Sequence, residues 1–183
     1  MTIAIIIGVV VFIAVVVIAQ YNSLVKVSQK TQNAWSQIDI QLQRRFDLIP
    51  NLVETVKGYA EHEKDVLEKV AKCRASYTDA QTVGEKANAE NEMEKFLKSV
   101  MAVAENYPEL KANQNFSALQ AELSDTESKI TFARQFYNDI VTIYNTKLEM
   151  FPSNIFAKMF GFKPETLFQA ETQAVRDNVK VQF

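Results

Sequence analysis

The chain contains few of the residues that metal sites and catalytic centres use. Its 183 residues include one cysteine, Cys73, and one histidine, His62. A single cysteine excludes an internal disulfide and any CxxC metal site. The stretch HEKDV at 62–66 lacks the second histidine of an HExxH zinc site, and no GxGxxG or GxxxxGK loop is present. We therefore predict no catalytic residues, no cofactor and no metal, a solvent-facing His62, and Cys73 as a small apolar filler.

Glycine and proline are also scarce, with four of each, whereas alanine, glutamate, lysine, glutamine and leucine are plentiful. This composition favours long helices and provides few of the turns that sheets need, so it predicts an all-α protein. The net charge of −2 offers no basic field for a nucleic-acid backbone. We therefore expect no nucleic-acid partner.

No charged side chain precedes Lys26, and every residue from Ile3 to Ala19 is apolar. Extended to Leu24, this run forms a helix of about 22 residues, long enough to cross a hydrocarbon layer of ~30 Å. It predicts a transmembrane anchor over residues 1–24 and the lipid bilayer as a partner. The alternative is a cleaved signal peptide, but the basic n-region of such a peptide is missing.

The sequence leaves open on which side of the membrane the soluble part lies. Lys26 and Lys30 follow the span and favour a cytoplasmic domain by the positive-inside rule. The predicted organisation is the anchor, a helical bundle over residues 25–152, and an aromatic-rich tail over 153–183. That tail, which contains Phe156, Phe160, Phe162 and Phe168, is expected to pack on the bundle or on a neighbouring subunit.

Apolar residues after the anchor recur every three or four positions, the spacing of one helix face. The first series continues the anchor to Ile49 without a linker, which predicts a single rod. Pro50 then predicts a hairpin turn and a second helix from Leu52 to about Asp79. The alternative is a three-helix bundle whose first helix only bends at Pro50.

Two further helices follow. The polar segment 79–93 predicts a loop into a third helix, which Pro108 ends. The inner face of this helix is expected to hold Met93, Phe96, Leu97, Val100, Val103 and Ala104. After a connection over 108–116, a fourth helix with a heptad-like apolar ladder extends to Phe151, and Pro152 marks its end. Four amphipathic helices predict an antiparallel four-helix bundle.

Two polar clusters interrupt this pattern. In RRFDLIPNL, residues 44–52, Asp47 is expected to cap the helix that restarts at Pro50, and the arginines are expected to pair with Asp47 or Glu54. Two Tyr-Asn pairs lie seven residues apart, so both tyrosines occupy one heptad position. We predict a structural polar seam, with a binding groove as the alternative, formed by Arg44, Arg45, Asp47, Asn51, Arg134, Tyr137, Asn138, Tyr144 and Asn145.

The chain resembles the LemA family. The similarity lies in AWSQIDIQLQRRFDLIPNLVETVKGYAEHE at 34–63, in NFSALQAELSDTESKITFARQFYNDIVTIYNTKLEMFP at 115–152, and in the terminal VKVQF. The resemblance implies a bacterial membrane protein with a helical soluble part and no established enzymatic activity. Some similar proteins carry a lipoprotein cysteine just before the first Tyr-Asn pair, which would place the domain outside the cytoplasm. This chain has Gln20 there.

These features predict a single-pass protein of the bacterial cytoplasmic membrane that is not an enzyme and acts as a self-assembling scaffold. The alternative is an adaptor that docks a membrane protease or another envelope complex, and a hydrolase using surface carboxylates is a third class. Homo-oligomerisation is expected because two helices carry apolar residues beside their main ladders, namely Phe132, Phe136, Ile143 and Met150, and Val53, Ala60 and Leu67.

Overall fold

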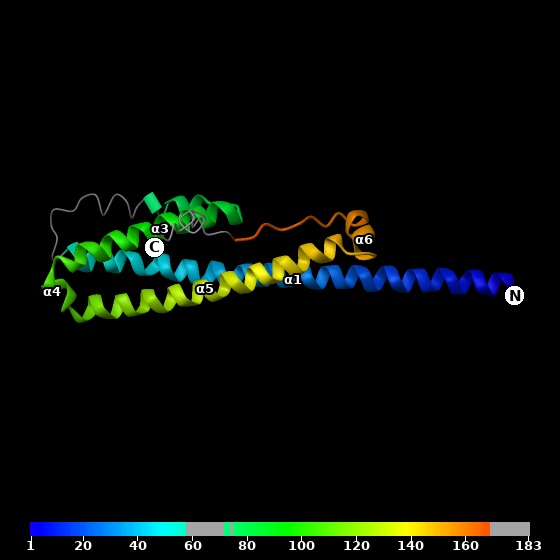
Figure 1. The fold of residues 1–183 in the computed structure, drawn as a ribbon, viewed down its shortest axis with the longest axis horizontal. Helices are drawn as coiled ribbons and strands as arrows, with labels where there is room; N and C mark the ends of the chain where they lie inside the picture. Colours follow the sequence, from blue (N-terminus) through cyan, green and yellow to red (C-terminus); the bar gives the residue numbers. More distant parts are fainter. Residues whose placement is uncertain (58–71, 74, 169–183) are drawn as a thin grey trace, which may run out of the picture. The chain divides into compact units, whose positions relative to one another are not determined.

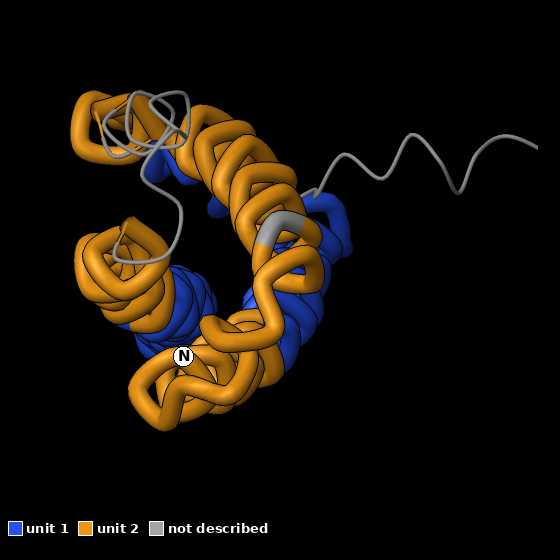
Figure 2. Tube along the Cα trace, turned by 90° about the vertical axis from the view of Figure 1, so that its left-hand side faces the viewer, with its two compact units in different colours: residues 1–40, 131–167 blue, residues 41–130, 168–183 orange. Residues whose placement is uncertain are grey.

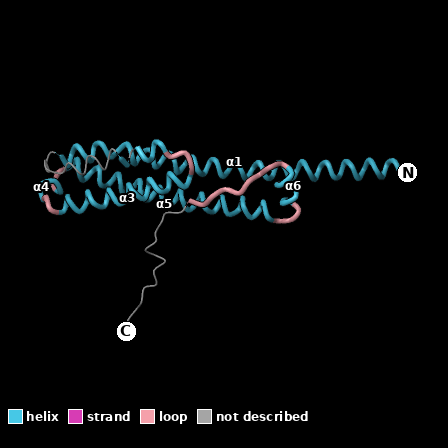
Figure 3. The backbone as a smooth tube through the Cα atoms, turned by 90° about the horizontal axis from the view of Figure 1, so that it is seen from above, coloured by secondary structure: helices cyan, strands magenta, loops and turns pink. Residues whose placement is uncertain are grey.

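The computed structural model describes residues 1–57, 72–73 and 75–168, and this part of the chain contains helices and no strand. The helices are α1 (Thr2–Lys57), α3 (Val83–Glu105), α4 (Pro108–Lys111), α5 (Gln114–Glu149) and α6 (Ser153–Met159) (Figures 1 and 3). Residues 72–73 and 75–79 are also helical. The all-α prediction is therefore confirmed.

The chain divides into two compact units (Figure 2). Unit 1 comprises residues 1–40 and 131–167, and unit 2 comprises residues 41–130 and 168–183. Both α1 and α5 contribute a segment to each unit. His62, the predicted second-helix positions from Tyr59 to Val70, and the terminal VKVQF lie outside the described residues.

The segment predicted as an anchor and the first predicted bundle helix form one continuous helix, α1, as the unbroken ladder predicts. Residues 1–15 are exposed throughout, and α1 is the one helix in the described part of the chain that is long and apolar enough to cross a membrane. The core ladder begins at Leu24, which is fully buried, and continues through Ile38 and Leu42.

The predicted hairpin at Pro50 is wrong, because α1 continues through this proline to Lys57. A proline inside a helix loses one hydrogen bond and costs ~3 kcal/mol. Four apolar side chains around the proline are buried, namely Ile49, Leu52, Val53 and Val56. Burial of each stabilises the fold by about 1.5–3 kcal/mol, and together they outweigh the cost of the proline. Asp47 therefore lies within a helix and caps nothing, contrary to the prediction.

Unit 2 is held by contacts between its helical segments. The rings of Phe46 on α1 and Tyr77 stack with centroids 4.1 Å apart. Segment 114–130 of α5 lies antiparallel to segment 41–57 of α1 (Figures 1 and 3). Both apolar ladders face inward there. Cys73 is buried in this unit, as predicted, and burial raises the pKa of its thiol.

The predicted loop over 79–93 is mostly helical, because α3 already begins at Val83. Its start is a capping box that the prediction missed. The Glu85 N–H donates to Thr82 Oγ1 at 3.2 Å, while Glu85 Oε2 accepts from the N–H groups of Gln81 and Thr82 at 2.8 and 2.9 Å. These hydrogen bonds lower the pKa of Glu85. The earlier start brings Glu90 onto the inner face, where it is buried with Met93.

The fourth helix agrees closely with the prediction, because α5 starts at Gln114 and ends at Glu149, just before Pro152. Asn113 caps it: its Oδ1 accepts the N–H of Asn115 at 2.8 Å and that of Phe116 at 3.2 Å.

In unit 1 the chain reverses after α6. The N–H of Phe162 donates to Ala157 O at 3.0 Å and that of Gly161 to Lys158 O at 3.3 Å, the two bonds of a Schellman motif. Gly161 has a φ of +74°, a conformation that a residue without Cβ adopts easily. The chain from Phe162 therefore returns along α5.

Candidate functional site

The nine residues of the predicted polar seam lie at two separate places in the fold. Four of them, Arg44, Arg45, Asp47 and Asn51, belong to the α1 segment of unit 2. The other five belong to the α5 segment of unit 1: Arg134, Tyr137, Asn138, Tyr144 and Asn145. Each place has its own set of partners.

A buried ion cluster lies in unit 2. The side chain of Arg45 is 5% exposed and that of Glu90 is 0% exposed, and Arg45 Nη1 donates to Glu90 Oε1. The same nitrogen forms an ion pair with Glu127 Oε2 at 2.5 Å. One arginine thus joins α1, α3 and α5. Removing two charges from water costs several kcal/mol per ion, so the burial of Arg45 depends on Glu90 and the burial of Glu90 depends on Arg45.

The other three residues of this segment are exposed. Arg44 Nη2 donates to Glu122 Oε1 at 2.8 Å, and this hydrogen bond raises the pKa of Arg44. Both arginines therefore pair with carboxylates on other helices, and the predicted pairing with Asp47 or Glu54 is wrong. Asn51 lines a cleft of about 570 Å³ that also includes Asn115 and Glu122.

A second cluster, in unit 1, binds the returning chain by its backbone; we call it the tail clamp. Asn145 forms two hydrogen bonds with Glu165, because its Nδ2 donates to Glu165 O at 2.8 Å and its Oδ1 accepts the Glu165 N–H at 3.0 Å. The hydroxyl of Tyr144 donates to Lys163 O at 3.0 Å, and that of Tyr137 donates to Thr166 O at 3.0 Å. The heptad spacing of the two Tyr-Asn pairs places these donors in a row along the tail.

Burial defines the electrostatics of the tail clamp. Tyr137 is 1% exposed, and its ring packs against Trp35 with centroids 5.6 Å apart. Burial, and to a smaller extent the charge of Glu165, raises the pKa of Tyr137 to about 12. The same two causes raise the pKa of Tyr144. Both phenols therefore remain protonated donors at neutral pH. Arg134 and Asn138 are half-buried on the same helix.

Sequence reasoning missed the partners of both clusters. Glu90 and Glu127 were not predicted as partners, because a glutamate in a polar segment is normally a solvent-exposed residue. A signal was present, however: the steps back from Leu97 through Met93 reach Glu90, so a charge continues an apolar ladder. The partners in the tail clamp are main-chain atoms of residues 163–166, which no side-chain pattern identifies.

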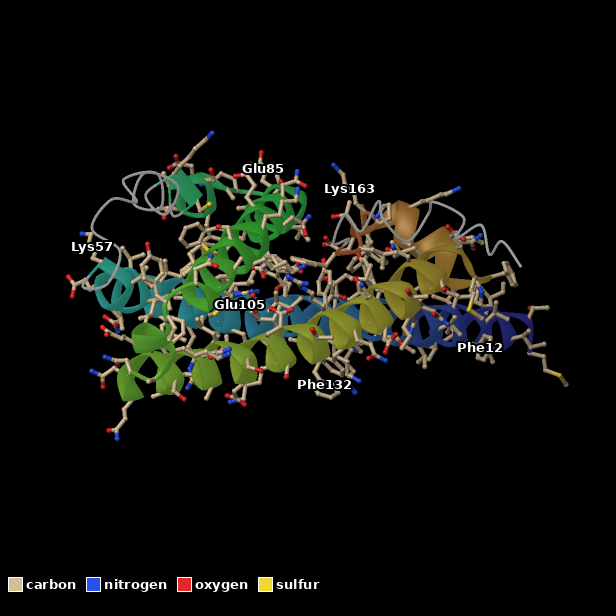
Figure 4. All side chains as sticks on the ribbon, turned by 60° about the vertical axis from the view of Figure 1, so that its left-hand side comes forward. Phe12, Lys57, Glu85, Glu105, Phe132 and Lys163 are labelled. Atoms are coloured by element: carbon tan, nitrogen blue, oxygen red, sulfur yellow. The ribbon has the colours of Figure 1, made fainter. Side chains whose placement is uncertain are left out.

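An apolar stripe also remains uncovered on α5; we call it the α5 stripe. Its members, each about half exposed or more, are Phe132 (73%), Phe136 (49%) and Ile143 (55%), together with Met150 (58%) directly after the last residue of α5. Figure 4 shows Phe132 on the outer side of the helix. Within the described ranges, no group of three or more histidine, cysteine or acidic side chains is arranged to hold a metal ion.

Comparison with known proteins finds similarity to LemA and MamQ proteins. The model of the LemA family matches residues 34–183. Magnetosome protein MamQ 2 of Paramagnetospirillum magneticum is 26% identical over 190 residues, which cover 90% of this chain and 70% of the relative. Protein LemA of Metamycoplasma hominis is 25% identical over 159 residues, covering 85% and 71%. Magnetosome protein MamQ of Magnetospirillum gryphiswaldense is 22% identical over 170 residues, covering 79% and 62%. These relatives and the apolar helix suggest a membrane-associated protein.

Proposed function

Because this chain belongs to the LemA family, we propose that it is a non-catalytic scaffold, anchored by one span in the bacterial cytoplasmic membrane, whose helical part self-assembles. The observation that carries this proposal is the α5 stripe. It offers an apolar contact surface on a membrane-tethered domain.

The stripe is a distinct second face of α5. At ~100° per residue, Phe132, Phe136, Ile143 and Met150 fall within roughly 40° of one another. The buried residues Ile130, Tyr137 and Tyr144 lie about 120–160° away from Phe132 by the same geometry. A globular helix needs one apolar face for its own core. The opposite face is therefore available to a second copy.

Tethering makes a small contact sufficient. Domains held in one plane by α1 meet at a high effective concentration, so weak apolar contacts produce assemblies that free domains would not form. If the stripe meets a different surface on the next copy, the contact repeats laterally and gives a ring or a lattice according to whether its rotation closes.

The test compares two pairs of substitutions on α5 in the full-length protein. Phe132→Ser with Phe136→Ser removes apolar area from the stripe, whereas Thr131→Ser with Gln135→Ser changes exposed residues at the same spacing. We expect mass photometry after mild detergent extraction, and crosslinking in native membranes, to show oligomers for the wild type and the control pair. The stripe pair should be mostly monomeric, because the contact loses its apolar surface.

A monomeric wild type over a tenfold concentration range, with no crosslinked ladder, would contradict the scaffold. The adaptor for a membrane protease or another envelope complex is the alternative. It is favoured if a crosslinker placed at Phe136 captures a different membrane protein and no second copy of this chain.

The side of the soluble part has its own test. A cysteine added after Phe183, in a Cys73→Ser background, is treated with an impermeant maleimide in intact spheroplasts. Labelling places the C-terminus outside the cytoplasm. Labelling only after lysis places it inside, as Lys26 and Lys30 favour.

A further inference from the structure

A second apolar surface, which we call the elbow, extends from the turn after α5 to the end of α6. Its exposed side chains are Phe151, Ile155, Met159 and Phe160, and Phe151 has the largest exposed fraction, 80%. Ile155 and Met159 are four residues apart and share one side of α6, while Ser153 and Ala157 are buried. The short helix is therefore amphipathic, with its apolar side outward.

The elbow is fixed to α1 where the apolar span ends. The rings of Tyr21 and Phe160 meet edge to face with centroids 4.8 Å apart, and Phe162 lies 6.2 Å from the same tyrosine. Lys147 Nζ donates to Ser23 Oγ, and Ser153 Oγ donates to Lys147 O at 2.6 Å. All these residues belong to unit 1, so they define one local arrangement.

The position of these contacts corresponds to the edge of a bilayer. The continuous apolar run of α1 ends at Ala19 and is followed by Gln20, Tyr21 and Asn22, which places the edge of a hydrocarbon layer near Tyr21. Aromatic side chains gather at this depth in membrane proteins. A groove of about 720 Å³ opens at the same level, lined by Ala19 and Ser23 on α1, by Met150 and by Phe151 of the elbow.

Charge also suits a lipid surface. The stretch MFPSNIFAKMFGFKP, residues 150–164, contains two lysines and no acidic residue. Lys158 and Lys163 are both exposed, as is Lys26 on α1. Apolar side chains beside lysines are the composition of segments that lie in the headgroup region of anionic membranes.

We propose that the elbow inserts into the interfacial layer of the bilayer that α1 spans, so that Phe151, Ile155 and Met159 contact lipid. The domain then has two membrane contacts, the anchor and the elbow, and its tilt about the anchor is restricted. This inference rests on anchoring by α1 and is independent of self-assembly through the α5 stripe.

Depth-dependent quenching tests this contact in the full-length protein. Single cysteines at Ile155, Gln135 and Val10, in a Cys73→Ser background, carry an NBD fluorophore in vesicles of phosphatidylcholine and phosphatidylglycerol. Gln135 is an exposed site on α5, about 22 Å along the helix from Met150. We expect lipids with a shallow nitroxide to quench the Ile155 probe severalfold more than the Gln135 probe, with a blue-shifted emission at Ile155.

Substitutions in the elbow sharpen the result. Phe151→Gln with Met159→Gln should remove most of the quenching at Ile155, whereas Phe132→Gln with Phe136→Gln on the α5 stripe should leave it unchanged. Circular dichroism checks that each variant keeps its helix content.

Two outcomes would overturn the inference. One is equal quenching at Ile155 and Gln135 while deep nitroxides still quench Val10, since the anchor is then inserted and the elbow is not. The other is a blue shift at Ile155 that lipid nitroxides do not affect and that disappears on dilution with excess lipid, because a second copy then covers the elbow. A silent Val10 probe would instead contradict the anchor, and with it the elbow contact.

Discussion

The two units, to which α1 and α5 each contribute a segment, use their polar residues in different ways. In unit 2, Arg45 is buried and bonded to the side chains of Glu90 and Glu127, so charges from three helices hold one another. In unit 1, Tyr144 and Asn145 bond to main-chain atoms of an extended segment. The first arrangement depends on the identity of its partners, and the second depends only on where a backbone runs.

This difference predicts different consequences of mutation. A buried charge whose partner is removed has no alternative in the core, so its loss affects the whole unit. A backbone segment at the surface whose clamp is removed can bond to water instead, so the effect stays local. We therefore expect substitutions that remove a buried charge to destabilise unit 2 as a whole, and substitutions that remove a hydrogen bond of the tail clamp to affect unit 1 only locally.

The largest effect is expected for Arg45→Met. It leaves Glu90 buried without its cation and should lower the free energy of unfolding by ~3–5 kcal/mol, measured by urea unfolding of the detergent-solubilised protein. Arg45→Met with Glu90→Met should recover most of that loss, since two apolar side chains replace the pair. Arg44→Met, at the exposed pair with Glu122, is the control and should have little effect. Equal losses for the two arginines would remove the contrast between buried and exposed charge.

A smaller, pH-dependent effect is expected at Tyr137. Its phenol ionises near pH 10 in the unfolded chain but near 12 in the folded one, so unfolding between these values releases a proton and rising pH destabilises the fold. The full shift corresponds to a loss of about 3 kcal/mol in the free energy of unfolding at the alkaline end. Tyr137→Phe should lose ~1 kcal/mol at neutral pH but show a flatter alkaline decline.

Trp35 provides the readout for this prediction, because its fluorescence reports on the neighbouring ring. Tyr107→Phe, at an exposed tyrosine, is the matched control and should follow the wild-type decline. A Tyr137→Phe profile parallel to that of the wild type from pH 10 to 12 would show that the phenol does not contribute.

The smallest global effect is expected at Asn145. Asn145→Ala removes both bonds to Glu165 and should cost about 1 kcal/mol, yet amide hydrogen exchange of a peptide spanning 160–168 should become much faster. Asn145→Asp keeps the acceptor and loses the donor, so its exchange rate should be intermediate. Thr146→Ala, at the next exposed position, is the control. Exchange as slow in Asn145→Ala as in the wild type would mean that other contacts hold the segment.

Local patterns predicted much of the fold because they act over a few residues. The ladder from Leu24 to Ile49 and the helix end before Pro152 depend on spacing and on single side chains, and α1 and α5 agree with them. The capping box at Thr82 and Glu85 had the same local character and was readable. The loop prediction over 79–93 failed because polarity was given more weight than this cap.

The sequence by itself determined the all-α class, the apolar span and the two apolar faces of α5, because composition and period encode them. Its motifs at 34–63 and 115–152 gave the resemblance to the LemA family. Tertiary structure alone decided three features. Helix α1 passes through Pro50 because the residues beside it find a core, and Arg45 pairs with Glu90 because three helices converge there. The Tyr-Asn pairs bind residues 163–166 because Gly161 turns the chain back. Each of these three features depends on contacts between residues far apart in the sequence. The repeat of apolar residues along one helix does not specify which other segment packs against it.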